Sequence, residues 1–277
     1  MEIVSEKTMW LKTRCELGFN IVDPTPFVFM LRPRSAASQW VMQEIYDVQP
    51  RIQVTEAMDP FGNLCQRLIA PKGDFRIQTS SLVMTADHSG IDHTAEFTPV
   101  PELPDEILTF LLPSRYCEAD RHNALALEVV NTSAPGYPQV ESIVEWIRHY
   151  IEYIPGSSGY PVSAVEVVER RYGVCRDLAH VGISLCRSLC IPARLVVGYL
   201  HGLEPMDIHA WFEAYVGGRW FTFDATQRNL EGARIAIAYG RDAADVAICN
   251  QYGPAVDPSH MFVDVTEEKS ESLPGMD

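Results

Sequence analysis

Hydrophobic and polar residues alternate along much of the first third of the chain. Within residues 11–87, apolar positions such as Phe75, Ile77 and Thr79 are separated by polar ones, which is the period of a half-buried strand. Turn-forming residues at 59–63 interrupt this pattern with Asp, Pro, Gly and Asn. These features predict a small antiparallel β-domain, which we expect to be a sandwich.

A proline-rich run at residues 99–104 marks a change of pattern, because proline at this density continues neither a helix nor a strand. Beyond it, apolar residues recur at steps of three and four from Val140 to Ile154, which predicts a helix with one buried stripe. Ser163 and Glu166 have the spacing of a capping box and predict the start of a second, short helix. We therefore place a linker in the proline-rich run.

The last third of the chain is rich in predicted strands. Helices followed by antiparallel strands are typical of an α+β domain rather than of a doubly wound sheet. We place the strands at residues 194–200, 209–216, 219–224 and 261–265. The expected organisation is an N-terminal β-rich domain at residues 1–97, an α+β domain at residues 98–266 with its core at about 140–226, and an acidic tail at residues 267–277.

Composition narrows the class of protein. The 277 residues carry a formal net charge of -15, which argues against a nucleic-acid partner or an anionic membrane partner. The sequence shows neither the pattern of a signal peptide nor an uncharged stretch of about 18 residues that would predict a transmembrane span. The seven cysteines are odd in number and include no CxxC pair, so we expect reduced thiols in a cytoplasmic protein. The sequence leaves the oligomeric state open.

Two groups of residues have side chains that bind metals, and we interpret both otherwise. His88 and His93 lie among acidic residues after a predicted strand, where a solvated loop is the usual structure. Cys186 and Cys190 are four residues apart but have leucines beside them, which is typical of a helix core. We therefore expect no metal and no other cofactor.

A helix is predicted to begin at Cys175 and to end before Pro192. Gly173, just ahead of it, can adopt backbone angles that other residues cannot. Cys175 lies on the same stripe as Leu178 and Gly182, so we expect its sulfur to point toward the surface on which the helix packs. The free amides and the positive dipole end of a helix N-terminus stabilise a thiolate, which is the reactive form of cysteine. Cys175 is therefore the candidate nucleophile.

A predicted β-hairpin supplies a base and an acid. Residues 217–218 are Gly-Gly, which is typical of a two-residue type I′ turn. If Val216 pairs with Arg219 across this turn, His209 and Asp224 are diagonal neighbours on one face, within reach of a hydrogen bond. A shift of one residue would put them on opposite faces. A thiol, a histidine and a carboxylate are the parts of a nucleophilic acyl-transfer site, but the sequence does not establish that the helix packs against this face.

Other polar residues near these motifs have open or structural interpretations. His180 lies about 140° around the helix from Cys175, so we expect a structural role rather than that of the base. Arg176 could pair with an acidic residue or lie at the surface. Asp242 and Asp245, with the neighbouring arginine, could form a functional rim or a buried ion pair.

Three blocks of sequence, taken in order, resemble the signature of the transglutaminase-like superfamily, in its bacterial cysteine protease type. These blocks are residues 173–180, 209–213 and 220–226. Residues 59–63 are similar to the N-terminal domain that bacterial proteins of this kind carry, and residues 240–246 are similar to a segment found after the triad. Ala225 stands where many relatives have proline, and we expect this to change the strand exit but to leave the carboxylate in place.

The resemblance implies a papain-like transglutaminase core and a catalytic triad of Cys175, His209 and Asp224, acting through an acyl-cysteine thioester. It also implies an enzyme whose partner is a peptide or protein amide. We expect hydrolysis, because water is the default acceptor and no stretch is recognisable as an amine site. The alternatives are a protein-glutamine transamidase, which cross-links proteins, and a non-catalytic binding module of the same fold.

Overall fold

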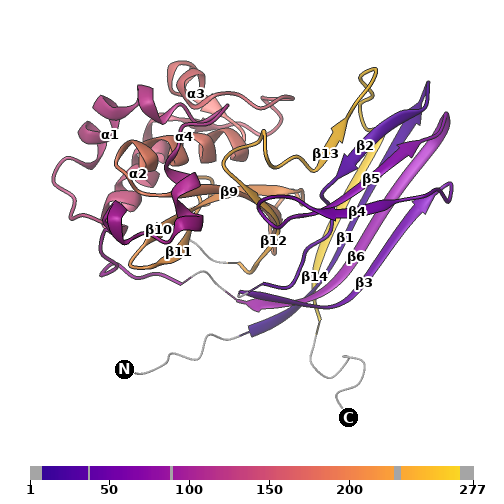
Figure 1. Ribbon diagram of the computed structural model, residues 1–277, viewed down its shortest axis with the longest axis horizontal. Helices are drawn as coiled ribbons and strands as arrows, with labels where there is room; N and C mark the ends of the chain where they lie inside the picture. The colour runs from indigo at the N-terminus through magenta and orange to yellow at the C-terminus, as the bar shows by residue number, and fades with distance from the viewer. Residues whose placement is uncertain (1–7, 37, 88–89, 228–231, 269–277) are drawn as a thin grey trace, which may run out of the picture.

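The computed structural model describes residues 8–36, 38–87, 90–227 and 232–268. A β-sandwich lies beside a part in which helices cover a smaller sheet (Figure 1). This is the α+β organisation with an N-terminal sandwich that the sequence predicted. Within the described ranges, no helix has the length and apolarity needed to span a membrane.

Two four-stranded antiparallel sheets form the sandwich. Phe19, Phe27, Phe29 and Phe75 pack between them, and the rings of Phe27 and Phe29 stack with their centroids 5.2 Å apart. The first sheet has the order β14 (His260–Glu268), β1 (Thr8–Ile21), β6 (Gly73–Ala86) and β3 (Gln39–Gln49). The second has the order β13 (Cys249–Gln251), β2 (Thr25–Phe29), β5 (Leu64–Ala70) and β4 (Thr55–Met58).

The C-terminal strands return to the N-terminal sheets, where β14 lies beside β1 (Figure 1). Leu17 pairs with Met261 and Trp10 with Glu268, while β13 pairs with β2. The expected division at residue 97 therefore differs from the observed pairing, since strands of the predicted second domain complete both sheets of the first. The predicted acidic tail is wrong for Glu267 and Glu268, which belong to β14; residues 269–277 lie outside the described residues.

A sheet of order β11-β10-β9-β12 forms the base of the helical part. Its strands are β9 (Ala193–Leu200), β10 (His209–Val216), β11 (Arg219–Phe223) and β12 (Arg234–Gly240), and a small parallel pair is formed by β7 (Glu152–Tyr153) and β8 (Tyr172–Gly173). The α-helices are α1 (Asn123–Val130), α2 (Tyr137–Tyr150), α3 (Ala164–Arg170) and α4 (Cys175–Ser188), and short 3-10 helices are η1 (Val100–Glu102), η2 (Asp105–Leu111) and η3 (Ala119–Arg121).

Local signals located most of these elements. Cys175 starts α4, and Ser163 caps α3 by accepting a hydrogen bond from the amide of Glu166 at 3.4 Å. The predicted helix to Ile154 is too long by four residues, because α2 ends at Tyr150 and the chain continues into β7. The proline-rich segment starts η1 and packs rather than only linking, since Leu103 is buried against Tyr215. The sequence analysis did not predict β12.

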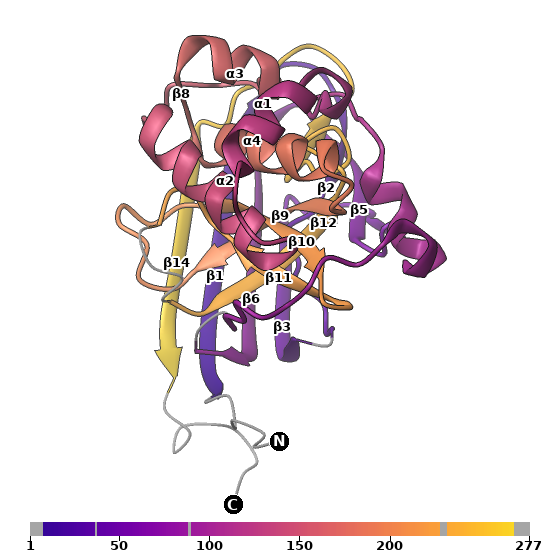
Figure 2. The same cartoon turned by 90° about the vertical axis from the view of Figure 1, so that its left-hand side faces the viewer.

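The helix that begins at Cys175 packs directly on the central strands of the sheet, as Figure 2 shows for α4 with β9 and β10. Gly182 permits this close approach, because a Cβ atom there would lie 2.5 Å from Cε1 of Phe212 on β10. The sequence analysis could not establish this contact. It brings the first turn of α4 to the end of β10 at which His209 lies.

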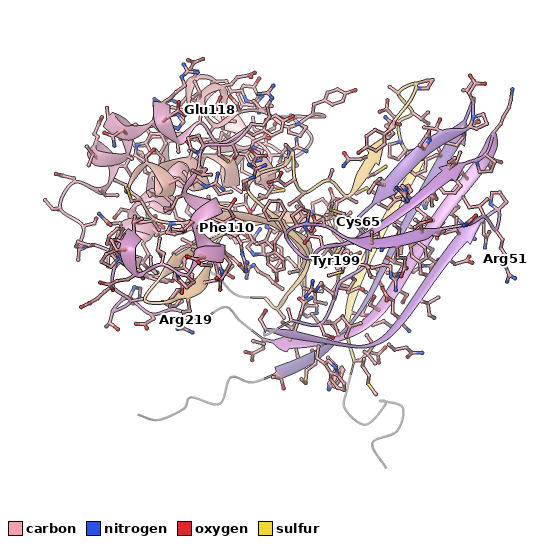
Figure 3. The ribbon with its side chains drawn as sticks, viewed as in Figure 1. Arg51, Cys65, Phe110, Glu118, Tyr199 and Arg219 are labelled. Carbon is pink, nitrogen blue, oxygen red and sulfur yellow. The ribbon has the colours of Figure 1, made fainter. Side chains whose placement is uncertain are left out.

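The two parts of the molecule join along β12 and β9, with Tyr199 of β9 at the junction (Figure 3). Asn63 of the sandwich is 1% exposed, and its amide group pairs with both backbone groups of Tyr239 on β12, at 2.7 and 2.8 Å. Asp59 holds Asn63 in turn, accepting from its side-chain amide at 2.8 Å. The 59–63 turn therefore docks the sandwich on the edge of the smaller sheet.

Candidate active site

Cys175 is the first residue of α4 and is partly buried against the core. Gly173 lies outside the positive-φ region, so the expectation of unusual backbone angles is wrong. It provides space instead, because a Cβ atom there would lie 2.9 Å from Cβ of Asp177. Asp177 is fully buried, accepts a hydrogen bond from the amide of Val174 at 3.3 Å, and pairs with Arg170 at 2.9 Å. This arrangement fixes the first turn that carries the thiol.

The β10–β11 hairpin has the predicted register. Val216 pairs with Arg219, and both residues of the Gly-Gly turn have positive φ, 57° for Gly217 and 77° for Gly218, as a type I′ turn requires. Because side chains alternate along a strand, this register puts His209 and Asp224 on the same face. A register shift of one residue would have put them on opposite faces.

His209 and Asp224 form a buried pair. Nε2 of His209 lies 2.8 Å from Oδ2 of Asp224, and each side chain is 1% exposed. Burial by itself would lower the pKa of His209, but hydrogen bonds and charge from Asp224 and Cys175 outweigh it and raise this pKa to about 10. Burial would likewise raise the pKa of Asp224, but the hydrogen bond to His209 and the nearby cations lower it. The pair is therefore an imidazolium and a carboxylate near neutral pH.

The structure brings Cys175, His209 and Asp224 together. Cys175 lies close enough to His209 to raise its pKa, and Asp224 binds the same imidazole at 2.8 Å. Because Nε2 faces Asp224, Nδ1 is the nitrogen left for the thiol. A helix N-terminus and a neighbouring imidazolium both favour a thiolate, and a carboxylate behind the imidazole fixes its orientation. This arrangement can perform nucleophilic attack on an acyl carbon.

Asp224 is held by groups that the sequence analysis missed. Thr226 donates to Oδ1 from its amide at 3.0 Å and from its hydroxyl at 2.7 Å, and Arg234 lies 3.3 Å from Oδ2. Arg148 of α2 donates to the backbone carbonyl of Asp224 at 2.9 Å. The spacing of Thr226 is a recognisable local signal, because Asp commonly binds backbone and hydroxyl groups two residues ahead. Arg148 and Arg234 reach the site from other elements and leave no such signal.

Tyr153 and Asp207 lie at the edge of the site. Tyr153 pairs with Gly173 in the β7–β8 ladder, two residues before the thiol. Burial, with the charges of Cys175, Asp207 and Asp224, raises the pKa of Tyr153 to about 12. Burial also raises the pKa of Asp207, while His209 lowers it. The surroundings of the thiol therefore include a phenol and a second carboxyl group.

His180 has the structural role that the sequence predicted. It is fully buried, its Nδ1 donates to the carbonyl of Val162 at 2.9 Å, and its Nε2 accepts from the amide of Ala243 at 3.2 Å. Burial lowers the pKa of His180, in keeping with a neutral ring that donates at one nitrogen and accepts at the other. His180 therefore connects the loops on either side of α4 rather than serving the thiol.

The charged residues with open interpretations form structural pairs. Arg241 binds Asp245 at 2.8 Å, and Asp242 is buried and accepts from the amide of Tyr116 at 2.7 Å. Arg176 faces Asp177 across 3.4 Å. These contacts favour ion pairs and loop anchoring over a rim around the site.

The side chains considered as metal ligands lie apart from the thiol. Cys186 is fully buried and Cys190 is exposed, and His93 binds Glu141 at 2.9 Å. His88 lies outside the described residues. In the ranges that the structure describes, no three His, Cys, Asp or Glu side chains meet in an arrangement that would hold a metal ion.

Comparison with known proteins places the chain in a family. The sequence model of the Transglutaminase-like superfamily matches residues 123–225, which contain Cys175, His209 and Asp224. A crystal structure described as a Putative Cysteine Protease from Cytophaga hutchinsonii is 36% identical, with a TM-score of 0.89, over 97% of this chain and 93% of that one. The chain therefore belongs to the transglutaminase-like superfamily.

Two mycobacterial proteins are also similar in sequence. Uncharacterized protein ML0607 of Mycobacterium leprae is 27% identical over 230 residues, which is 78% of this chain and 82% of that protein. Uncharacterized protein Rv2569c of Mycobacterium tuberculosis is 30% identical over 136 residues, which is 41% of this chain and 43% of that protein. The likeness to the Cytophaga protein and to the first of these extends well beyond the family core.

Proposed function

We propose that this protein is a thiol-dependent hydrolase of peptide or other amide bonds, with Cys175, His209 and Asp224 as its catalytic triad. The observation that carries the proposal is the position of the thiol at the first residue of α4, near enough to an imidazole to raise its pKa, while that imidazole binds a buried carboxylate. Family membership and the name of the Cytophaga relative support the same chemistry. The substrate is accordingly a peptide or protein amide.

The first half of the reaction forms a thioester. Sγ of Cys175 attacks the amide carbon, and the C–N bond breaks as His209 gives a proton to the departing amine. Free amides at the start of α4 stabilise the oxyanion, and the amide of Cys175 is the nearest of these. Asp224 keeps the imidazole oriented and stabilises its charged form.

The second half of the reaction releases the acid. Water attacks the thioester carbon while His209 takes a proton from it, and the C–S bond breaks to regenerate the thiolate. Water is the acceptor we favour because it is present in large excess unless a site excludes it. An amine acceptor would instead give a transamidase, and an inert thiol would indicate a binding module.

The first test compares two thiols of the same helix region. Cys175 is expected to react with iodoacetamide at pH 6 at least ten times faster than exposed Cys190, which has no imidazole partner among its described hydrogen bonds. Peptide mass spectrometry measures both rates in one sample. His209→Ala is expected to remove the difference while leaving the Cys190 rate unchanged. Equal rates in the unaltered protein would refute the nucleophile.

The second test identifies the acceptor. The protein is exposed to a peptide library with and without a primary amine, and the acyl adduct on Cys175 and the products are weighed by mass spectrometry. Free carboxylic acids in both samples support hydrolysis. Amide products that form only with the amine would support transamidation, and an adduct-free Cys175 with unchanged peptides would contradict both enzymatic readings.

A further inference from the structure

Arg234 is a buried cation in contact with the carboxylate of the proposed triad. Its side chain is 6% exposed, and its Nη2 lies 3.3 Å from Oδ2 of Asp224. The same oxygen binds His209 at 2.8 Å. The guanidinium also lies over the ring of Trp211, 5.9 Å from its centroid, and that ring stacks on His209. Arg234 therefore shares an acceptor with the imidazole and touches its aromatic neighbour.

The sandwich holds the strand that carries Arg234. Thr85 of β6 donates its hydroxyl to the backbone carbonyl of Arg234 at 3.0 Å. The side-chain amide of Gln39 on β3 pairs with both backbone groups of Ala236, each at 2.8 Å. Thr85 and Gln39 are each 6% exposed, so water does not compete strongly for these bonds. The edge of β12 is thus fixed by side chains from the other part of the molecule.

We propose that Arg234 is a positioning residue that balances the charge of Asp224, and that the β-sandwich is part of the active site because it holds Arg234 through Thr85 and Gln39. The inference rests on the proposed function and deepens it. A carboxylate with no second cation would bind the imidazolium more strongly, and His209 would release its proton to the leaving amine less readily. The sandwich then holds Arg234 in position for the reaction, and we call this support of β12 by Thr85 and Gln39 the brace.

The charge around His209 comes from several elements. Asp224 follows β11, Cys175 begins α4, Arg234 begins β12, and Asp207 precedes β10. Tyr153 on β7 interacts electrostatically with Cys175, Asp207 and Asp224. Besides His209, the cations near Asp224 are Arg234, which contacts its carboxylate, and Arg148 of α2, which donates to its backbone carbonyl. Loss of the Arg234 charge is therefore expected to shift the pKa of His209 and to leave the contacts of the thiol largely unchanged.

The test is the titration of His209, followed by NMR of histidine-labelled protein that carries Cys175→Ala, with His209→Gln used to assign the signal. Arg234→Met keeps an unbranched side chain and removes its charge, and it is expected to raise the pKa of His209 by about one unit. Arg234→Lys is expected to recover most of this shift. An unchanged or lowered pKa in Arg234→Met, or no recovery by Arg234→Lys, would overturn the role of Arg234.

A matched pair of interface variants tests the brace. Thr85→Val with Gln39→Leu releases the end of β12 at Arg234, and we expect the pKa of His209 to move in the same direction as in Arg234→Met, by a smaller amount. Asn63→Leu releases the other end of β12, at Tyr239. We expect it to lower the stability of the protein without shifting the pKa of His209. Equal shifts in both variants, or no shift in the first, would overturn the brace.

The titration is independent of activity, so the two proposals can fail separately. A slow Cys175 in the alkylation experiment, together with the expected shift in Arg234→Met, would remove the enzymatic function and keep the charge balance. A fast Cys175 without the shift would keep the triad and remove Arg234 from it.

Discussion

Among the described residues, four polar contacts hold the carboxylate of Asp224, and its two oxygens have different partners. Oδ2 faces the cations His209 and Arg234, while Oδ1 is held by the amide and hydroxyl of Thr226. The backbone carbonyl is anchored by Arg148. A carboxylate that is fixed by so many donors costs little reorganisation when charge develops on the imidazole. Its orientation is therefore a property of the fold.

The buried pair has a definite pH window. The pKa of His209 is raised to about 10, so its contribution to stability is complete below its ordinary value of about 6.5 and is lost as the pH rises toward 10. The pKa of Asp224 is lowered, so its contribution is complete above its ordinary value of about 3.9 and is lost in acid below it. The pair thus stabilises the fold most between about pH 4 and 6.5.

Asp224→Asn is predicted to lower the free energy of unfolding by about 3–5 kcal/mol at pH 5.5, because it leaves a buried imidazolium without its carboxylate. The difference from the unaltered protein is expected to shrink as the pH rises toward 10, because His209 of the unaltered protein loses its proton there. Urea denaturation across this pH range measures it. A difference that stays constant or grows with pH would contradict the ion pair.

Residue-level prediction from the sequence worked where chemistry and local pattern coincide. A helix start, a Gly-Gly turn and strand alternation restrict the positions of Cys175, His209 and Asp224, and the structure has that helix start and that register. Their catalytic role stays a prediction. Arg234 escaped because it begins β12, which β10 and β9 separate in the sheet from β11, the strand that Asp224 follows. No local spacing encodes such a contact.

At the scale of elements, the fit between α4 and β10 sets the distance between thiol and imidazole. Gly182 lies over the ring of Phe212, where an added methyl group would be 2.5 Å from the ring carbon. The helix would have to move outward to accept it, because core side chains are already close-packed. This contact couples a buried glycine to the candidate active site.

Gly182→Ala is predicted to destabilise the protein by about 1–3 kcal/mol, since overpacking costs more than the gain in helix propensity. It is also expected to slow alkylation of Cys175. Gly159→Ala is the control, because a Cβ atom there would meet nothing within 4 Å and its φ is not positive. Thermal denaturation and the iodoacetamide rate provide the readouts. Equal behaviour of the two variants would disprove the coupling.

Helices and hairpins were predictable because their signals are local. The caps of α3 and the start of α4 lie within a few residues of the elements they define. By contrast, β12 consists of Arg-Ile-Ala-Ile-Ala-Tyr-Gly and is buried along almost its whole length, so it has no polar alternation to reveal it. A short apolar run of this kind is consistent with either a buried strand or a buried helix segment until its neighbours are known.

At the scale of the whole molecule, the first and last described strands, β1 and β14, pair in one sheet. Val263 and Val265 of β14 are buried in the sandwich, while their neighbours on the strand face outward. Sequence patterns predicted a strand near these residues but not its partner, because the pairing of distant strands depends on the complete fold. For the same reason, the expected division at residue 97 did not anticipate that β13 and β14 pair with strands of the N-terminal part.

Val265→Asp is predicted to lower the free energy of unfolding by several kcal/mol, because it places an unpaired carboxylate inside the sandwich. Thr266→Asp, on the adjacent outward-facing residue, is expected to change it by less than about 0.5 kcal/mol. Chemical denaturation of both variants compares them. Similar stabilities would mean that β14 is not inserted in the sheet as described.

The pairing of β14 with β1 also has a consequence for how the protein is made. The ribosome makes β14 long after its partner β1, so one edge of β1 stays unpaired until the residues from 260 onward have emerged. Nascent chains stopped before residue 260 should therefore be cut by added protease within β1 more readily than the released protein. Completion of the sandwich, and with it the support behind Arg234, is expected only once β14 has emerged.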